Sequence, residues 1–271
     1  MDKIGAVSEW AITIFGKTII VDPVMLGTTW FIMAVLALMA WQIGRRLTIV
    51  PSKSQSVFEL LTGFFDDIAV STLGKKEGRR LLPLILSIFV FILVSNWIGI
   101  FPNVIKTVGT LIGVVHAWIN PDVVYSAVWY KGLLTFPDLK EPTQSLSTDL
   151  GMAILVFLVA HATAIHNKGV LGYVRSFIDD PFPMKGWKVL FFWANPFFYL
   201  NLIGQVANVV SHSFRLFGNV FGGGIIIIIV SELLRHFLVP VGLFAFFGLF
   251  SGLIQAFVFS MLTVSYINQL Q

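Results

Sequence analysis

The longest apolar stretch of this sequence holds a single charged residue. Between Lys188 and Glu232 the only formal charge is Arg215. An arginine at membrane depth costs from about 2.5 to about 17 kcal/mol according to how the cost is measured, and such residues usually face protein or water. No Asp or Glu lies within two helical turns of Arg215. A counter-charge for Arg215 must therefore come from another segment or from another chain.

The composition places the whole chain in a membrane. Of its 271 residues, 56% are hydrophobic and 12% are charged, whereas soluble domains carry roughly 25% charged residues. The mean hydropathy is +0.86. We expect an all-α polytopic membrane protein. The absence of cysteine excludes disulfides and thiolate metal sites, and we expect neither a metal nor a cofactor. The net charge of +4 comes from short basic clusters between apolar runs, so it does not indicate nucleic-acid binding.

Apolar runs of about 20 residues predict the membrane spans. Three such runs are residues 23–44, 81–101 and 148–165. Two longer apolar segments follow at residues 189–235 and 240–267. The pattern therefore predicts five spans in a single membrane domain.

Three further segments are expected outside the spans. Residues 1–22 lack a clean apolar core and a small-residue cleavage site, and we interpret them as a retained interfacial segment rather than a signal peptide. Residues 51–73 mix apolar residues with carboxylates, which predicts an amphipathic helix at the interface. Residues 103–147 form a long outer loop, for which we predict no span although residues 108–118 could touch the membrane.

Basic residues set the orientation of the chain. Lys and Arg are concentrated in residues 45–80 and 168–188, whereas the longer connection 103–147 holds only three lysines. By the positive-inside rule the two basic connections face the cytoplasm. With five spans, the N-terminus is then outside and the C-terminus is cytoplasmic.

The segment around Arg215 is too long for a simple span. One helix over residues 196–235 would be about 60 Å long at 1.5 Å per residue, twice the ~30 Å hydrocarbon core. Two arrangements fit: two short helices that meet at Arg215, or one strongly inclined helix against a large partner. The sequence leaves this open.

Two motifs near the C-terminal end are specific in combination. They are SHSFRLFGNVFGG at residues 211–223 and LIQAFVFSMLTVSYI at residues 253–267. With LSIFVFILVSNWIGIFP at residues 86–102 and FEL at residues 58–60, they resemble subunit a of the F-type rotary ATP synthases, in the same order along nearly the whole chain.

The resemblance implies an ion-translocating stator subunit with no ATP site of its own. In that family a ring of c subunits, each with one membrane carboxylate, rotates past subunit a. Two offset half-channels bring ions to the carboxylate from opposite sides. The resemblance further implies that the last two helices are long, strongly tilted and packed along the ring. The implied partners are the c-ring, the peripheral-stalk subunit b and the lipid bilayer, in a bacterial plasma (inner) membrane.

The resemblance also assigns the central residues. The family's essential arginine corresponds to Arg215, its glutamine on the last helix to Gln255, and its asparagine one turn after the arginine to Asn219. We expect Gln255 to accept a hydrogen bond from Arg215. The alternative is that its amide only joins two helices through a hydrogen bond. Asn219, at i+4 from Arg215, is expected to orient the guanidinium, with plain packing as the alternative.

An unpaired arginine in a low dielectric has two electrostatic consequences. It favours the charged form of a passing ring carboxylate and so displaces the bound ion. It also repels a cation that would otherwise leak directly between the half-channels.

The half-channels have several candidate residues. Ser211 and His212 are candidates for the cytoplasmic half-channel, although a structural hydrogen bond explains the histidine equally well. Glu232 and His236 are candidates for the outer mouth. Asp149 is a further candidate there, with a charge at a helix N-terminus as the alternative.

The sequence departs from the family at three positions. Many members carry a carboxylate and an imidazole as proton relays in the outer half-channel, and the corresponding positions here are Gly224 and Gly248. Asn201 stands where a family carboxylate is common. Either water fills the space beside the glycines and carries protons, or the coupling ion is Na⁺; we favour protons slightly.

Two other functions fit the composition less well. A stand-alone cation transporter could use Arg215 as an internal charge, but such carriers often contain inverted repeats and none is visible here. A membrane hydrolase would need Ser213 to contact His212, and adjacent helical residues point about 100° apart.

Overall fold

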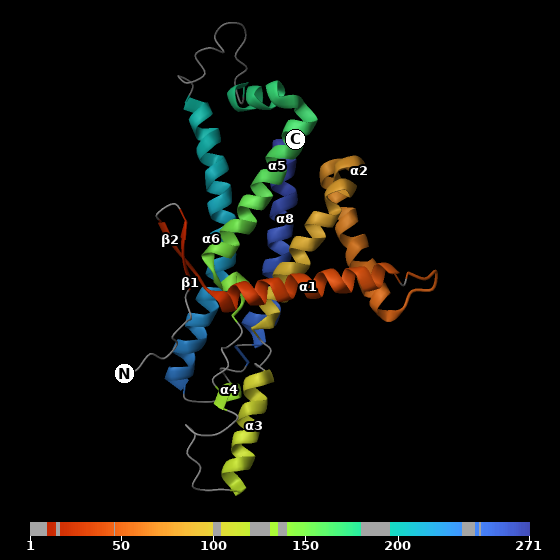
Figure 1. Cartoon of the computed structure of the whole chain (residues 1–271). Helices are drawn as coiled ribbons and strands as arrows, with labels where there is room; N and C mark the ends of the chain where they lie inside the picture. Colours follow the sequence, from red (N-terminus) through yellow and green to blue (C-terminus); the bar gives the residue numbers. More distant parts are fainter. Residues whose placement is uncertain are drawn as a thin grey trace.

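The computed structural model of the chain shows a helical membrane protein with a small hairpin at its N-terminal end (Figure 1). The structure describes residues 10–14, 17–45, 47–99, 104–119, 131–134, 140–179, 196–234, 242–243 and 245–271. Five of the helices in these ranges are long and apolar enough to cross a membrane. The predicted class, an all-α polytopic membrane protein with about five membrane helices, is confirmed.

The elements follow one another in a simple order. The longer helices are α1 (Pro23–Arg45), α2 (Lys53–Ile98), α3 (Val104–Ile119), α5 (Leu146–Asp179), α6 (Pro196–Leu234) and α8 (Gly252–Leu270). The shorter elements are β1 (Trp10–Ile14), β2 (Lys17–Val21), α4 (Lys131–Leu134), the 3-10 turn η1 (Pro142–Gln144) and the π-helix η3 (Phe246–Ser251).

The N-terminal segment holds a structure that the sequence did not predict. Strands β1 and β2 pair antiparallel, with Trp10 opposite Val21 and Ile14 opposite Lys17. The interfacial placement of residues 1–22 remains a prediction, and within it residues 10–14 and 17–21 form this hairpin.

Helix α2 is two helices joined by a sharp turn. Gly74 has φ 81° and ψ 161°, a conformation that is essentially restricted to glycine. Residues 53–73 form the first arm, which lies within residues 51–73, the segment predicted to be an amphipathic interfacial helix. Residues 75–98 form the second, more apolar arm. The two arms approach closely at Gly78, where a Cβ would stand 2.6 Å from the carbonyl oxygen of Ala69. Phe65 and Phe89 pack between the arms with ring centroids 4.8 Å apart.

Helix α5 is divided in the same way. Gly169 has φ 72° and ψ 163°, so the membrane arm ends there and a second, short helix continues to Asp179. Residues 168–188 were expected as a basic connection between spans, and the structure continues as helix through the first part of this connection. Because glycine is common in loops and in helix ends alike, the sequence did not show that helix resumes after the turn.

Helix α6 runs without interruption for 39 residues, through Arg215. At 1.5 Å per residue it is about 58 Å long. Of the two arrangements that the sequence left open, the structure has the single helix. Helix α3, by contrast, lies within the predicted outer loop, and its 16 residues are too few for a span.

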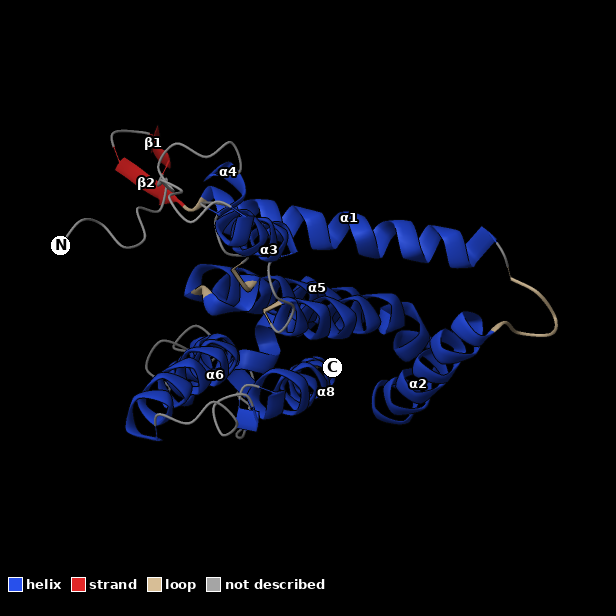
Figure 2. Cartoon of the chain, turned by 90° about the horizontal axis from the view of Figure 1, so that it is seen from below, coloured by secondary structure: helices blue, strands red, loops and turns tan. Residues whose placement is uncertain are grey.

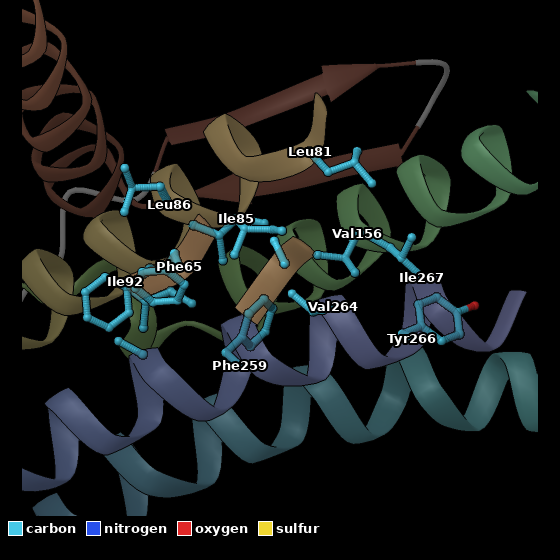
Figure 3. Packing of buried hydrophobic residues seen from close by; sticks show 14 of the residues in the cluster. Phe65, Leu81, Ile85, Leu86, Ile92, Val156, Phe259, Val264, Tyr266 and Ile267 are labelled. Carbon is cyan, nitrogen blue, oxygen red and sulfur yellow. The ribbon is translucent and has the colours of Figure 1, made fainter. Parts of the chain in front are cut away.

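The core lies where α2, α5 and α8 meet (Figure 3). Its fully buried side chains include Phe65 and Ile85 from the two arms of α2, Val156 from α5 and Phe259 from α8. Helix α6 contributes only Leu216 to this cluster, as far as the described residues show.

Helix α1 is attached to this core on one side only. Figure 2 places α5 between α1 and the pair formed by α6 and α8. The buried side chains of α1 are Thr28 and Ile32. Most of its apolar surface is therefore exposed, as expected for a helix in lipid.

Candidate ion-translocation site

Arg215 lies on the outward face of α6. Its side chain is exposed, whereas the adjacent Leu216 is fully buried. No hydrogen bond or ion pair joins the Arg215 guanidinium to any residue that the structure describes, and the ion pairs of Asp66, Glu77 and Asp22 lie outside α6. The guanidinium therefore faces away from the chain's own core without a counter-charge from the described segments.

The residues around Arg215 form an exposed row along one face of α6, with the spacing of a helix face. The row consists of Ser211, Phe214, Arg215, Gly218, Phe221 and Ile225. Ser211 and Gly218 lie one turn on either side of the arginine, and a Cβ at Gly218 would meet nothing within 4 Å. Small residues allow another helix to approach closely, so the row has the shape of a contact surface around Arg215.

Gln255 lies on α8 with only 7% of its surface exposed. Its Nε2 is buried without a hydrogen-bond partner among the described residues. No hydrogen bond joins it to Arg215 here. The pairing of the two residues therefore remains a prediction.

Asn219 is bound to the last helix. Its Oδ1 accepts a hydrogen bond of 2.5 Å from Ser251 Oγ, at the end of η3. Around this junction, Asn96 Nδ2 donates to the carbonyl oxygen of Gly252 at 3.1 Å, and Trp97 Nε1 donates to that of Leu249 at 3.2 Å. Single-turn π-helices are frequent at functional sites. Neither η3 nor the end of α2 was predicted as part of the site. The signal in the sequence was the polar Asn96 inside an apolar run.

Asp149 is fully buried in the first turn of α5. Both of its carboxylate oxygens lack a hydrogen-bond partner within the described part of the chain, and so does the buried Oγ of Ser95. Thr143, also fully buried, donates a hydrogen bond of 2.7 Å to Asn96 Oδ1. A buried carboxylate without donors carries a large free-energy penalty, which distinguishes Asp149 from an ordinary helix-terminal charge.

The turn η1 is fixed by groups that the sequence analysis did not single out. Lys140 Nζ lies 2.5 Å from Asp22 Oδ2 at the start of α1. Glu141 lies against Gly99, where a Cβ would be 1.8 Å from Glu141 Oε1. Burial raises the pKa of the Glu141 carboxyl to about 7. This end of the molecule thus holds a carboxyl that titrates near neutral pH.

The remaining predicted residues are spread over α6 and its surroundings. His212 is buried, and its Nδ1 lies 2.9 Å from the carbonyl oxygen of Asn208. Glu232 is exposed near the end of α6, and His236 lies outside the described residues. Gly224 and Gly248 are partly buried, and a Cβ at Gly224 would meet nothing within 4 Å. Asn201 Nδ2 donates to the carbonyl oxygen of Phe177 at 3.2 Å, which joins α6 to the end of α5.

The fold and these side chains define a class: a multi-pass membrane protein in which a long unbroken helix, α6, presents an exposed arginine. This arginine has no charged partner within the described part of the chain. Residues 26–268 match the family model described as ATP synthase A chain. The chain is 31% identical to ATP synthase subunit a of Moorella thermoacetica, over 88% of this chain and 86% of the relative. It is 29% identical to "ATP synthase subunit a, sodium ion specific" of Propionigenium modestum, over 96% and 77%. This chain belongs to the ATP synthase subunit a family.

Proposed function

We propose that this chain is the ion-translocating stator subunit of an F-type ATP synthase, with Arg215 facing the membrane carboxylates of a c-ring. The observation that carries the proposal is the exposed Arg215 on α6, which has no counter-charge within the described part of its own chain. The other partners of the chain are a peripheral-stalk subunit b and the lipid bilayer of an energy-transducing membrane, most simply a bacterial plasma membrane. The N-terminus is outside and the C-terminus is cytoplasmic.

Electrostatics gives Arg215 its role. A guanidinium in a low dielectric stabilises the charged form of a ring carboxylate that comes within a few ångströms, and the carboxylate then releases its bound ion. A carboxylate fixed beside Arg215 would neutralise it permanently. The lack of such a partner among the described residues supports a counter-charge that arrives and leaves with the rotor.

The length of α6 supports the same arrangement. A helix of about 58 Å fits a ~30 Å hydrocarbon core only at a tilt near 60°, beyond the usual range of about 0–40°. Such a tilt needs a large protein surface beside the helix. The exposed row on α6 is the face we assign to that surface.

Polar groups on either side of Arg215 support two half-channels. On the cytoplasmic side we assign Ser211 and His212. On the outer side we assign Asp149, with Asn219 and the open space beside Gly224 leading towards Arg215. Gly248, Glu232 and His236 complete the candidates for the outer path.

Protons are the ion that we assign, with Na⁺ as the alternative. The sodium-specific relative from Propionigenium modestum is 29% identical to this chain, so family membership does not exclude Na⁺. Buried ionisable side chains near the path, Asp149 and His212, support protons.

The test uses the whole ATP synthase in proteoliposomes. ATP-driven ion uptake is measured for the parent complex, Arg215→Ala and the charge-conserving control Arg215→Lys, in Na⁺-free and Na⁺-containing buffer, with and without a protonophore. We expect Arg215→Ala to abolish coupled uptake although the complex assembles. Normal coupling in Arg215→Ala would reject the proposal, and uptake that requires Na⁺ and resists the protonophore would identify Na⁺ as the ion.

A further inference from the structure

A chain of hydrogen bonds joins α5, α6 and α8 beyond the predicted site. Tyr173 Oη lies 2.6 Å from His161 Nδ1, and Tyr266 Oη lies 3.2 Å from His161 Nε2. The Tyr266 hydroxyl also donates to Gln205 Oε1. These residues lie near the end of the membrane arm of α5, the start of α6 and the end of α8, which is the half assigned above to the cytoplasmic side.

The direction of each hydrogen bond follows from the chemistry of Gln205. An amide oxygen only accepts, so the Tyr266 hydrogen is committed to Gln205 and the Tyr266 oxygen accepts from His161 Nε2–H. A neutral imidazole with a hydrogen on Nε2 accepts at Nδ1, and Tyr173 therefore donates to it. All donors thus point the same way, from Tyr173 towards Gln205 on α6.

His212 provides an acceptor where this chain of bonds approaches Arg215. Its Nδ1 faces the carbonyl oxygen of Asn208, which only accepts, so the hydrogen of the neutral ring is on Nδ1. Nε2 is then a lone-pair acceptor, and it is buried without a partner among the residues that the structure describes. The rings of His212 and Tyr266 lie side by side, with centroids 6.3 Å apart. His212 is one helical turn from Arg215.

The surroundings favour protons over hydrated ions. The ring of His161 packs against those of Phe157 and Phe177, with centroids 4.0 and 6.4 Å away. In Figure 3 the Tyr266 ring lies at the edge of the hydrophobic cluster and its hydroxyl points out of it. Aromatic walls strengthen the hydrogen bonds that they enclose. Hard cations, in contrast, need several oxygen ligands, and this cluster combines two phenols and one amide oxygen with imidazole nitrogens.

We propose that Tyr173, His161, Tyr266 and His212 form a proton relay between the cytoplasmic surface and the region of Arg215. The relay rests on the proposed function and assigns titratable groups to the cytoplasmic half-channel, where Asn201 stands in place of a carboxylate. The ionisable groups of the cluster are His161 and Tyr173 from α5, His212 from α6 and Tyr266 from α8. Arg215 lies on the exposed face of α6 and acts on His212 electrostatically.

One transfer moves one proton through the relay. Tyr173 gives its hydroxyl proton to His161 Nδ1 and takes a proton from the cytoplasmic side. His161 releases its Nε2 proton to the Tyr266 oxygen, and Tyr266 turns from Gln205 and gives its own proton to His212 Nε2. His212 then carries one positive charge at i−3 from Arg215, and like-charge repulsion favours release of that proton to the rotor. Rotation of the His161 ring and the hydroxyls restores the starting order.

The test compares single variants in the complete ATP synthase. Tyr266→Phe keeps the ring and removes the hydroxyl, and His161→Gln keeps hydrogen-bonding groups but does not take up and release a proton. We expect each to lower ATP-driven proton uptake about 100-fold or more, in the range of general acid–base effects, with unchanged assembly. The matched control is Tyr199→Phe, an exposed tyrosine on α6, for which we expect unchanged uptake.

Three results would overturn the relay. Uptake at the wild-type rate in His161→Gln would show that the cluster has only a structural role. Uptake that depends on Na⁺ instead of protons would contradict a proton relay. If the two buried variants fail to assemble, Tyr173→Phe decides, and wild-type uptake in that variant rejects the relay. Arg215→Ala separates the two proposals, because loss of uptake there with normal uptake in His161→Gln rejects the relay alone.

Discussion

Ser251 Oγ donates a hydrogen bond of 2.5 Å to Asn219 Oδ1, which joins the two helices of the candidate site one turn beyond Arg215. The bond connects α6 to the π-helix that precedes α8, and the same π-helix is held by Trp97 of α2. Asn219 therefore positions α6 against the last helix, and its Oδ1 keeps one further lone pair for a second donor.

We expect Ser251→Ala to weaken the junction between α6 and η3. Loss of one hydrogen bond costs about 0.5–1.5 kcal/mol, and Asn219 would lose its fixed orientation. The measurement is heat-induced dissociation of the purified complex together with ATP-driven uptake. Ser265→Ala is the matched control, because that serine is exposed on α8. Equal dissociation temperatures for the two variants would contradict a structural role of the bond.

Asp149→Asn tests the buried carboxyl of α5. The substitution keeps the shape of the side chain and removes the ability to carry a charge. We expect it to reduce coupled uptake, because the variant side chain cannot become charged. The complex should be no less stable, because the substitution removes a buried carboxylate that has no hydrogen-bond donors. Asp67→Asn, on the exposed side of the amphipathic arm, is the control. Unchanged uptake in Asp149→Asn would leave only the role of a charge at a helix N-terminus.

Gly74→Ala tests the turn inside α2. The backbone of Gly74 occupies a region that costs other residues about 1–3 kcal/mol. We expect the variant to lower the temperature at which the complex dissociates. Gly63→Ala is the control in the same arm, where a Cβ would meet nothing within 4 Å and replacing glycine inside a helix is favourable by about 0.5–1 kcal/mol. A stabilising effect of both substitutions would contradict the prediction, because it would show that the turn at residue 74 takes up alanine without strain.

The buried Glu141 carboxyl predicts a pH dependence of stability. Burial raises its pKa from 4.5 to about 7, so the folded state favours the neutral carboxyl. The unfolded chain ionises first, and stability is lost as the pH rises from about 4.5 to about 7, with no further change from this group above that. Glu141→Gln should remove this part of the pH profile when dissociation temperature is followed against pH. An identical profile in the variant would exclude Glu141 as its source.

The sequence predicted the parts of this molecule that depend on local composition. Runs of about 20 apolar residues identify membrane helices because lipid offers no hydrogen bonds to the backbone. Arg215 stood out for the same reason, as the only charge in an apolar segment. The turns at Gly74 and Gly169 were not predicted, because a glycine in a helical pattern does not show its φ.

The cluster around His161 could not be predicted from the sequence, for a different reason. Its members come from three helices, and His161 and Tyr266 are 105 positions apart. Each taken alone is an ordinary polar residue in a membrane helix. Only the packing of α5 against α6 and α8 brings their hydroxyls and nitrogens to hydrogen-bonding distance. The same holds for Asn219, whose partner Ser251 lies on an element that the sequence did not reveal.

On the proposed function, the exposed row on α6 makes the stability of this chain depend on the number of c-rings available. Before a ring is present, the guanidinium faces hydrocarbon at a cost of about 2.5 kcal/mol or more. The proposed contact with a ring carboxylate would offset part of that penalty. Copies of this chain without a ring should thus be less stable than copies in the complex. In a cell that makes too few ring subunits, we expect the surplus copies to be degraded rather than to conduct ions across the membrane.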